Sequence, residues 1–126
     1  MGEDLRQLAL AALMLTAACN PSPNSGLETI EAYDGHAVFL DLSSIKHRDQ
    51  SIDLRTIWGP QDARERAHQG EMRIALELNC RTSEVRVTNL GFFVEGQLSI
   101  PSKQPRPVSG HVPSAGYIRR LFDRLC

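Results

Sequence analysis

Residues 71–81, with the sequence EMRIALELNCR, decide the fold of this protein. Apolar side chains occupy every second position of this stretch, and polar or charged side chains stand between them. The apolar positions are Met72, Ile74, Leu76, Leu78 and Cys80. Because successive side chains of a β-strand point to opposite faces of the sheet, the alternation predicts a strand with one buried and one solvated face. Strands of this kind are typical of antiparallel sheets.

The sequence around this strand carries the same period of two. Residues 27–33 and 36–42 flank the pair Asp34-Gly35, which is a strong signal for a tight β-hairpin. Residues 51–58 alternate as well, and residues 90–100 supply one or two further strands. We therefore predict an antiparallel meander of about five to six strands. Its buried face includes Val38, Leu40, Leu42 and, in the next strand, Trp58.

Polar stretches separate the expected strands. Residues 46–50 are predicted to form a polar turn. Residues 59–70, GPQDARERAHQG, have room for a turn of helix but no apolar stripe, and we expect them to form a long exposed hairpin loop. Residues 101–113 contain four prolines and are expected to be an extended loop.

The period changes at the end of the chain. Apolar residues stand at the i, i+3, i+4 and i+7 positions of a helix: Ile118, Leu121, Phe122 and Leu125. Ser114, after Pro113, is the expected N-cap. The overall prediction is an α+β fold, in which this C-terminal helix packs on the apolar face of the meander.

The N-terminal residues resemble an export signal. Residues 8–18 read LALAALMLTAA, which is too short to span a bilayer but suits the apolar core of a secretory signal. Small residues then precede Cys19, as in a bacterial lipobox, where the cysteine is acylated. We expect a signal peptide over 1–18, a lipid-anchored flexible tether over 19–26 and a domain over 27–126. The alternative is an N-terminal helix that packs in the core.

The charge balance excludes an electrostatic anchor. The whole chain has a formal net charge of −1, and loss of residues 1–18 would leave equal numbers of acidic and basic residues. No overall field then favours nucleic acid or anionic lipid, so membrane attachment would depend on the acyl chains at Cys19. Because Asn20, and not aspartate, follows Cys19, we expect delivery to the outer membrane.

If Cys19 carries lipid, two thiols remain, Cys80 and Cys126. In an oxidising compartment an even pair indicates a disulfide. Cys80 lies on the buried face of its strand and Cys126 at the end of the helix, which agrees with the expected docking. The alternative is two buried free thiols.

The sequence shows no catalytic or metal-binding pattern. The motifs of α/β-hydrolases, P-loop proteins and dinucleotide-binding proteins are absent, and the four histidines have no helical pair spacing. Asp41, Ser43 and Ser44 suggest a catalytic group, but such residues at a strand end more often bond their own backbone and fix a turn. We expect no catalytic residue, no metal site and no cofactor.

Together these features resemble the surface-adhesin protein E family of bacterial lipoproteins, over roughly residues 33–126. The resemblance rests on the expected turn of Asp41, Ser43, Ser44 and Ile45, the strand ending in Trp58, and the two cysteines in their contexts. It implies a curved antiparallel sheet with a C-terminal helix held by a disulfide. It also implies an outer-membrane adhesin that binds host matrix proteins.

We therefore expect an exported, non-enzymatic lipoprotein that binds a macromolecular partner. Two alternatives remain: a periplasmic module for a small apolar or haem-like ligand, and a structural envelope component.

A helix of about 12 residues is roughly 18 Å long and cannot cover the apolar face of a sheet about 24–29 Å wide. A homodimer, a ligand or a partner is expected to cover the rest. Phe92 and Phe93 must point to opposite faces, so one of them lies off the main core.

Overall fold

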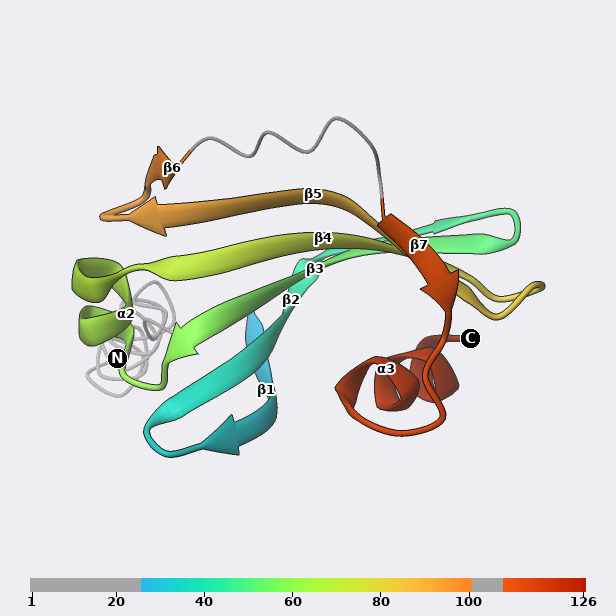
Figure 1. Ribbon diagram of the computed structural model, residues 1–126, viewed down its shortest axis with the longest axis horizontal. Coiled ribbons are helices and arrows are strands. Elements are labelled where there is room, and N and C mark those ends of the chain that lie inside the picture. Colours follow the sequence, from blue (N-terminus) through green and yellow to red (C-terminus); the bar gives the residue numbers. More distant parts are fainter. Residues whose placement is uncertain (1–25, 101–107) are drawn as a thin grey trace, which may run out of the picture.

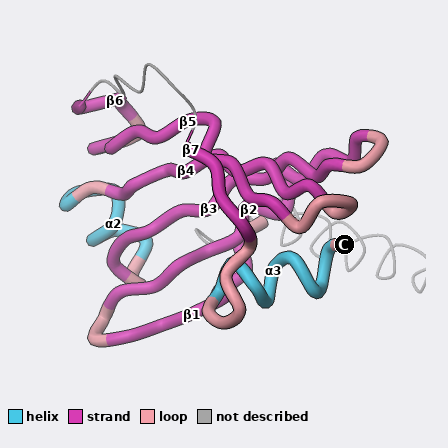
Figure 2. The backbone as a smooth tube through the Cα atoms, turned by 45° about the vertical axis from the view of Figure 1, so that its right-hand side comes forward, coloured by secondary structure: helices cyan, strands magenta, loops and turns pink. Residues whose placement is uncertain are grey.

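The computed structural model describes residues 26–100 and 108–126, which form a twisted antiparallel sheet with a helix at each end (Figures 1 and 2). The expected signal peptide, Cys19 and residues 19–25 of the expected tether lie outside the described residues. The elements in chain order are β1 (Leu27–Tyr33), β2 (His36–Arg48), β3 (Ser51–Pro60), α2 (Ala63–Gln69), β4 (Glu71–Asn79), β5 (Glu84–Val94), β6 (Gln97–Ile100), β7 (Val108–His111) and α3 (Tyr117–Leu125). Among the described helices, none is long and apolar enough to cross a membrane.

The described part of the sheet has seven strands, and its first six form the predicted meander. The strand order is β1-β2-β3-β4-β5-β6, and β7 pairs with the end of β5 that β6 leaves open. The Asp34-Gly35 hairpin is confirmed, because both residues adopt the positive φ angles, 45° and 78°, that this tight turn needs. The predicted α+β fold is therefore confirmed.

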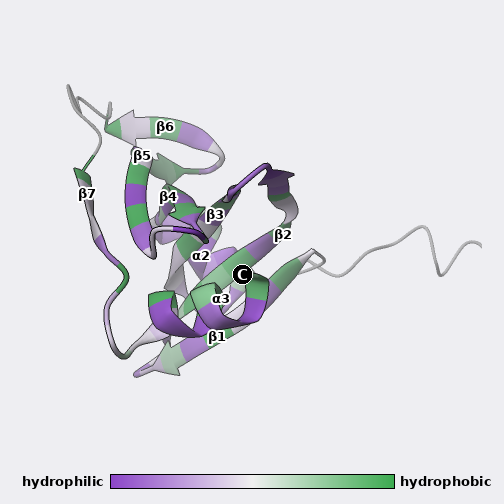
Figure 3. Cartoon of the chain, turned by 90° about the vertical axis from the view of Figure 1, so that its right-hand side faces the viewer, coloured by the Kyte–Doolittle hydropathy of each residue, from purple (hydrophilic) through white to green (hydrophobic). Residues whose placement is uncertain are grey.

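The main core lies between α3 and one face of the sheet, which we call the helix face. Leu121 of α3 is 2% exposed and packs with Leu40, Leu54, Leu76 and Leu78 of the central strands. Figure 3 shows α3 lying over the sheet beside β1, with hydrophobic and hydrophilic segments alternating along the helix and the strands. The predicted burial alternation in β4 holds from Arg73 to Asn79, whereas Met72, which was also expected on the buried face, is exposed.

Two ion pairs join α3 to the edge strand β1. Nη1 of Arg124 lies 2.6 Å from Oε1 of Glu28, and Nη2 of Arg120 lies 3.9 Å from Oε2 of Glu31. Both pairs are exposed, so each contributes little to stability. Their role is to orient the helix along β1, while the apolar contacts hold it on the sheet.

A smaller core lies on the opposite face, which we call the open face. Ala37, Phe39 and Ile57 are buried there, and the guanidinium of Arg66 from α2 lies 4.4 Å from the centre of the Phe39 ring. The prediction of an exposed loop over residues 59–70 was wrong, because α2 lies within this stretch. Its stabilisation comes from Arg66, which is 4% exposed, and not from an apolar stripe.

The missed signal for α2 is its N-terminus. Asp62 is the N-cap, and its carboxylate accepts hydrogen bonds from the backbone N–H groups of Arg64 and Glu65, at 2.9 and 3.0 Å. Asp62 followed three residues later by Glu65 has the spacing of a capping box. Local polar contacts thus form a helix that hydrophobic periodicity does not reveal.

Two further expectations about the C-terminal part were wrong. Residues 101–113 are not loop throughout, since β7 occupies Val108–His111 and pairs with β5. Ser114 does not cap the last helix; the N-cap is Gly116, with φ 95°, and the helix begins at Tyr117. The chain needs a left-handed residue to turn from β7 into α3, and glycine adopts this conformation without steric cost.

Candidate binding surface

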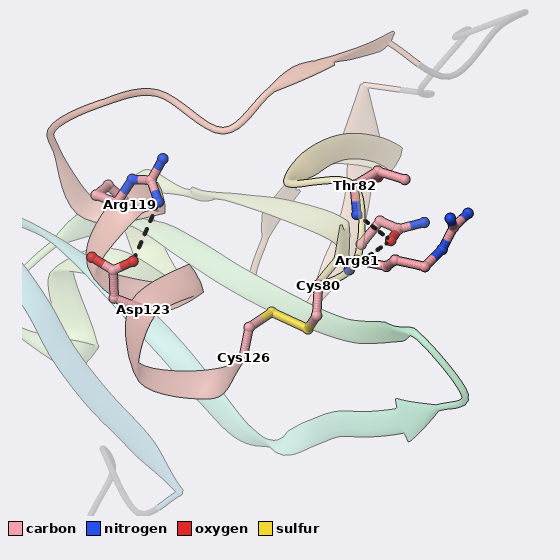
Figure 4. The surroundings of a disulfide bond; sticks show 7 residues. Cys80, Arg81, Thr82, Arg119, Asp123 and Cys126 are labelled. Atoms are coloured by element: carbon pink, nitrogen blue, oxygen red, sulfur yellow. Dashed lines mark hydrogen bonds and ion pairs between the residues drawn. A yellow bond between two sulfur atoms is a disulfide. The ribbon is translucent and has the colours of Figure 1, made fainter.

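Cys80 and Cys126, which the sequence predicted to pair, are linked by a disulfide bond. Their Cα–Cα distance is 5.4 Å, which is typical of such bonds (Figure 4). Cys126 directly follows the last residue of α3, and Cys80 directly follows β4. The bond therefore fastens the end of the helix to the sheet.

The Asp41 motif lies inside strand β2 and does not form the expected turn. The pairing of β2 with β3 shifts register between Asp41 and Lys46, so this segment is a β-bulge, and pairing resumes up to Arg48. The turn at residues 46–50 is therefore confined to its last two residues, between β2 and β3. The bulge also breaks the alternation, which explains why Leu42 is 43% exposed where it was expected on the buried face.

Hydrogen bonds within the motif account for the bulge. Asp41 is 7% exposed, and its carboxylate accepts from the Ser43 hydroxyl at 2.7 Å and from Nε of Arg55 at 3.2 Å. The Ser44 hydroxyl donates to the Asp41 carbonyl at 2.6 Å and accepts from the Arg55 backbone N–H at 2.8 Å. Burial raises the pKa of the Asp41 carboxyl, but the hydrogen bonds from Arg55 and Ser43 outweigh it and hold that pKa below its usual value. These partners make the motif a structural device.

The histidines are spread over the molecule. His36 begins β2, His47 lies near its end, His68 is in α2 and His111 ends β7. Within the described ranges, no group of three or more His, Cys, Asp or Glu side chains lies together as a metal site would require.

Part of the helix face is left uncovered by α3. One row of apolar residues crosses this face from β2 to β6, and each residue of the row is the cross-strand partner of the next. The row consists of Val38, Trp58, Met72, Phe92 and Ile100. Val38 at one end of the row is 1% exposed, Met72 in the middle is 37% exposed and Ile100 at the other end is 62% exposed, with a half-buried Phe92 between the last two. We call Met72, Phe92 and Ile100 the uncovered row.

The change along the row follows from the position of α3. Tyr117, at the start of α3, meets Trp58 edge to face, and Trp58 packs against the main core. The described helices place no comparable contact over Met72 and Ile100, which both remain exposed. The expectation that a short helix leaves apolar sheet surface open thus agrees with the structure.

An open groove of about 330 Å³ lies at Met72 and Phe92 of the uncovered row, beside β1 and the end of α2. Its lining consists of Tyr33, His36, Trp58, Gly59, Pro60, Gln69, Gly70, Met72 and Phe92. Tyr33 is 51% exposed at its edge. Phe92 therefore faces this groove, whereas Phe93 lies on the open face, with the Arg73 guanidinium 4.0 Å from its ring centre. The residues that line the groove come from several strands and from α2, and strand pairing brings them together. No single segment of the sequence therefore predicts the groove.

Solved structures identify the fold. A crystal structure of Haemophilus influenzae protein E, crystal form II, matches with a TM-score of 0.54 at 14% identity, over 77% of this chain and 91% of that chain. This fold is similar to that of protein E. The selenomethionine form of protein E matches with a TM-score of 0.52 at 11% identity, over 80% of this chain and 93% of that chain.

The resemblance to protein E is confirmed at the level of the fold, from the meander to the C-terminal helix. No family model and no curated protein matches the sequence. At 11–14% identity, residue roles do not transfer from protein E to this chain.

Proposed function

We propose that this chain is an exported, lipid-anchored envelope protein that binds a macromolecular partner through the uncovered row, without catalysing a reaction. The observation that carries the proposal is the exposure of large apolar side chains at Met72 and Ile100 on the same sheet face that carries the main core. Contiguous exposed apolar surface on a folded domain is characteristic of interaction sites.

Three observations support the location. The Cys80–Cys126 disulfide suits an oxidising compartment. Residues 1–19 have the order of a signal peptide followed by a lipid-accepting cysteine. The fold is similar to that of protein E, whose family implies a surface adhesin. Delivery to the outer membrane through lipid on Cys19 is part of the proposal.

The anchor is tested by the intact mass of the full chain from fractionated cells. We expect a membrane-bound chain that begins at an acylated Cys19 and gains two protons on reduction of its disulfide. A chain that retains residues 1–18, or a mature chain without lipid, would contradict the anchor and leave the binding surface to be tested separately.

The binding surface is tested by a photo-reactive residue at position 72 in the full chain, in intact cells. We expect one defined covalent adduct with another macromolecule, and its loss when Phe92→Glu is added. The matched control places the same probe at Asp49, an exposed position in the β2–β3 turn. An adduct of twice the chain mass would assign the row to a homodimer. Identical adducts from both positions, or none from position 72, would overturn the proposal.

A second candidate, a small apolar or haem-like ligand in the groove, is favoured by one observation. His36, a residue type that ligates haem iron, lines the groove together with Tyr33, Trp58 and Phe92. Titration of the full chain with haem would give a His36-dependent Soret shift if this reading holds, and His68→Ala is the control. An unchanged spectrum would exclude it. A purely structural envelope role would give neither a position-specific adduct nor a spectral change.

A further inference from the structure

The open face carries a hollow of about 580 Å³, well away from the uncovered row. The hollow lies over the side chains of four strands: Lys46 and Arg48 of β2, Asp53 and Arg55 of β3, Ala75 and Glu77 of β4, and Arg86 and Thr88 of β5. The alternation of β3 and β4 places these side chains opposite to Leu54 and Leu76, which face α3. Its size is that of a ligand site.

The shape of the hollow has an identifiable cause. Ala75, the cross-strand partner of both Arg55 and Asn89, places a small side chain in the middle of a row of long ones. The β2 bulge lies on one side of it, and the register shift that makes Thr88 an extra residue in β5 lies on the other. Bulges re-aim neighbouring side chains, so the long residues form a rim around a low centre.

The rim is rich in cations that are held in place by carboxylates. Nε of Arg48 lies 2.8 Å from Oδ2 of Asp53, and Nη2 of Arg86 lies 3.1 Å from Oε2 of Glu77. A guanidinium has five N–H donors, and each of these contacts engages one of its nitrogens, so further donors remain for a ligand. Lys46 makes no ion pair with any described residue. Arg55 is already paired with the Asp41 carboxylate, so the lining keeps Lys46, Arg48 and Arg86 against Asp53 and Glu77, an excess of one positive charge.

The hollow continues toward β6. A second hollow of about 310 Å³ shares Arg55 and Ala75 with the first and extends past Asn89 to Phe93 and Leu98. The two hollows therefore adjoin on the open face and together reach from the end of β2 to β6. Two adjoining hollows suit a segment of a polymer better than a single small anion.

We propose that this groove binds an acidic polysaccharide, with its sulfate or carboxylate groups on Lys46, Arg48 and Arg86. Asp53 and Glu77 can accept hydrogen bonds from sugar hydroxyls, whereas inorganic polyphosphate has no hydroxyl donors for them. The hydroxyls of Ser43, Ser44 and Thr88 in the lining add donors and acceptors of the same kind. A ligand that carries both anionic groups and hydroxyls matches this mixture, and the site is independent of the partner proposed for the uncovered row.

The test is isothermal titration of the full chain with a sulfated heparin hexasaccharide. We expect Lys46→Gln with Arg86→Gln to weaken binding at least tenfold and to lower its salt dependence. The matched control, Arg64→Gln with Arg120→Gln, removes the same charge from α2 and α3 and should bind as the unmodified chain does. Lys46→Gln alone breaks no ion pair and should weaken binding severalfold. This single variant keeps the proposal testable if the double variant does not fold.

Four outcomes would overturn the proposal. They are no binding of the hexasaccharide, equal loss in the two double variants, equal affinity for inorganic polyphosphate, and binding to anionic phosphatidylglycerol vesicles in place of the sugar. Met72→Glu changes the uncovered row only and should leave the affinity for the hexasaccharide unchanged, so failure of this site and failure of the proposed function are distinguishable.

Discussion

Trp58 and Tyr117 meet edge to face, with ring centroids 5.4 Å apart and ring planes at 81°. This contact holds the first residue of α3 on the sheet, while the Cys80–Cys126 disulfide holds the residue after its last. A helix of nine residues is too short to be stable alone, so its attachment at both ends accounts for its order. Trp58 is the single tryptophan of the chain, and its fluorescence therefore reports the docking of α3.

Replacing Cys80 and Cys126 by serine should lower the free energy of unfolding by about 2–5 kcal/mol, because the unfolded chain regains the freedom of a long loop. Urea unfolding followed by Trp58 fluorescence measures the loss. Reductant should bring the unmodified chain to the same midpoint and should not change the variant. An unmodified chain that is insensitive to reductant would contradict this role of the bond.

Asp41→Asn should destabilise the fold by about 1–3 kcal/mol, because the bulge loses a charged acceptor for Arg55. The pKa of the Asp41 carboxyl is lowered in the folded chain. Its contribution is therefore present above the unfolded pKa of about 3.9 and is lost as the pH falls through the lower folded value. Urea midpoints at several pH values should show the difference between the two chains shrinking below about pH 4. Asp49→Asn, at an exposed turn, is the control and should show no such difference.

The phenol of Tyr117 should ionise at a higher pH than an ordinary tyrosine. Burial, together with the nearby charges of Glu31 and Tyr33, raises the pKa of its phenol to about 12. In Tyr33→Phe, Tyr117 is the sole tyrosine; the variant removes only the smallest of the three causes, so phenolate absorbance should still develop above the unfolded value of about 10.

The same shift predicts the alkaline stability. Because the folded pKa of Tyr117 is raised, its contribution is complete below the unfolded pKa and declines as the pH rises from about 10 toward 12. Tyr117→Phe should remove this part of the alkaline decline in urea midpoints. A phenol in Tyr33→Phe that titrates near 10 would show that Tyr117 does not pack as described.

Gly70→Ala should destabilise the fold by about 2–4 kcal/mol, because a β-carbon there meets two problems. Gly70 has a φ of +111°, and the added carbon would lie 2.2 Å from Cζ of Phe92. Gly35→Ala, at φ +78° with open space around it, isolates the backbone strain. Thermal unfolding should show a larger loss for Gly70→Ala, and equal losses would mean that the Phe92 ring moves away at no cost.

The strands of the meander, their antiparallel pairing, the C-terminal helix and the disulfide followed from local patterns, whereas β7 did not. Period-two alternation in β4, the Asp34-Gly35 turn and the 3.6-residue period around Leu121 are each contained in a short window of sequence. The pairing of Cys80 with Cys126 followed because cysteine counting and side-chain direction agreed.

Errors arose where a local pattern was incomplete. α2 has no apolar stripe, because a buried Arg66 takes the place of apolar contacts. The Asp41 motif contains turn-forming residues, yet their hydrogen bonds with Arg55 in the neighbouring strand hold it inside β2 as a bulge.

The sequence by itself determined the antiparallel meander, the apolar face of its central strands and the pairing of the cysteines, because these depend on side-chain period and residue type. Only the tertiary structure decided which apolar residues stay exposed and which charges meet. Those outcomes depend on the register between strands and on how far α3 reaches. The uncovered row and the cationic groove are both products of strand pairing, in which residues far apart in the chain become neighbours across the sheet.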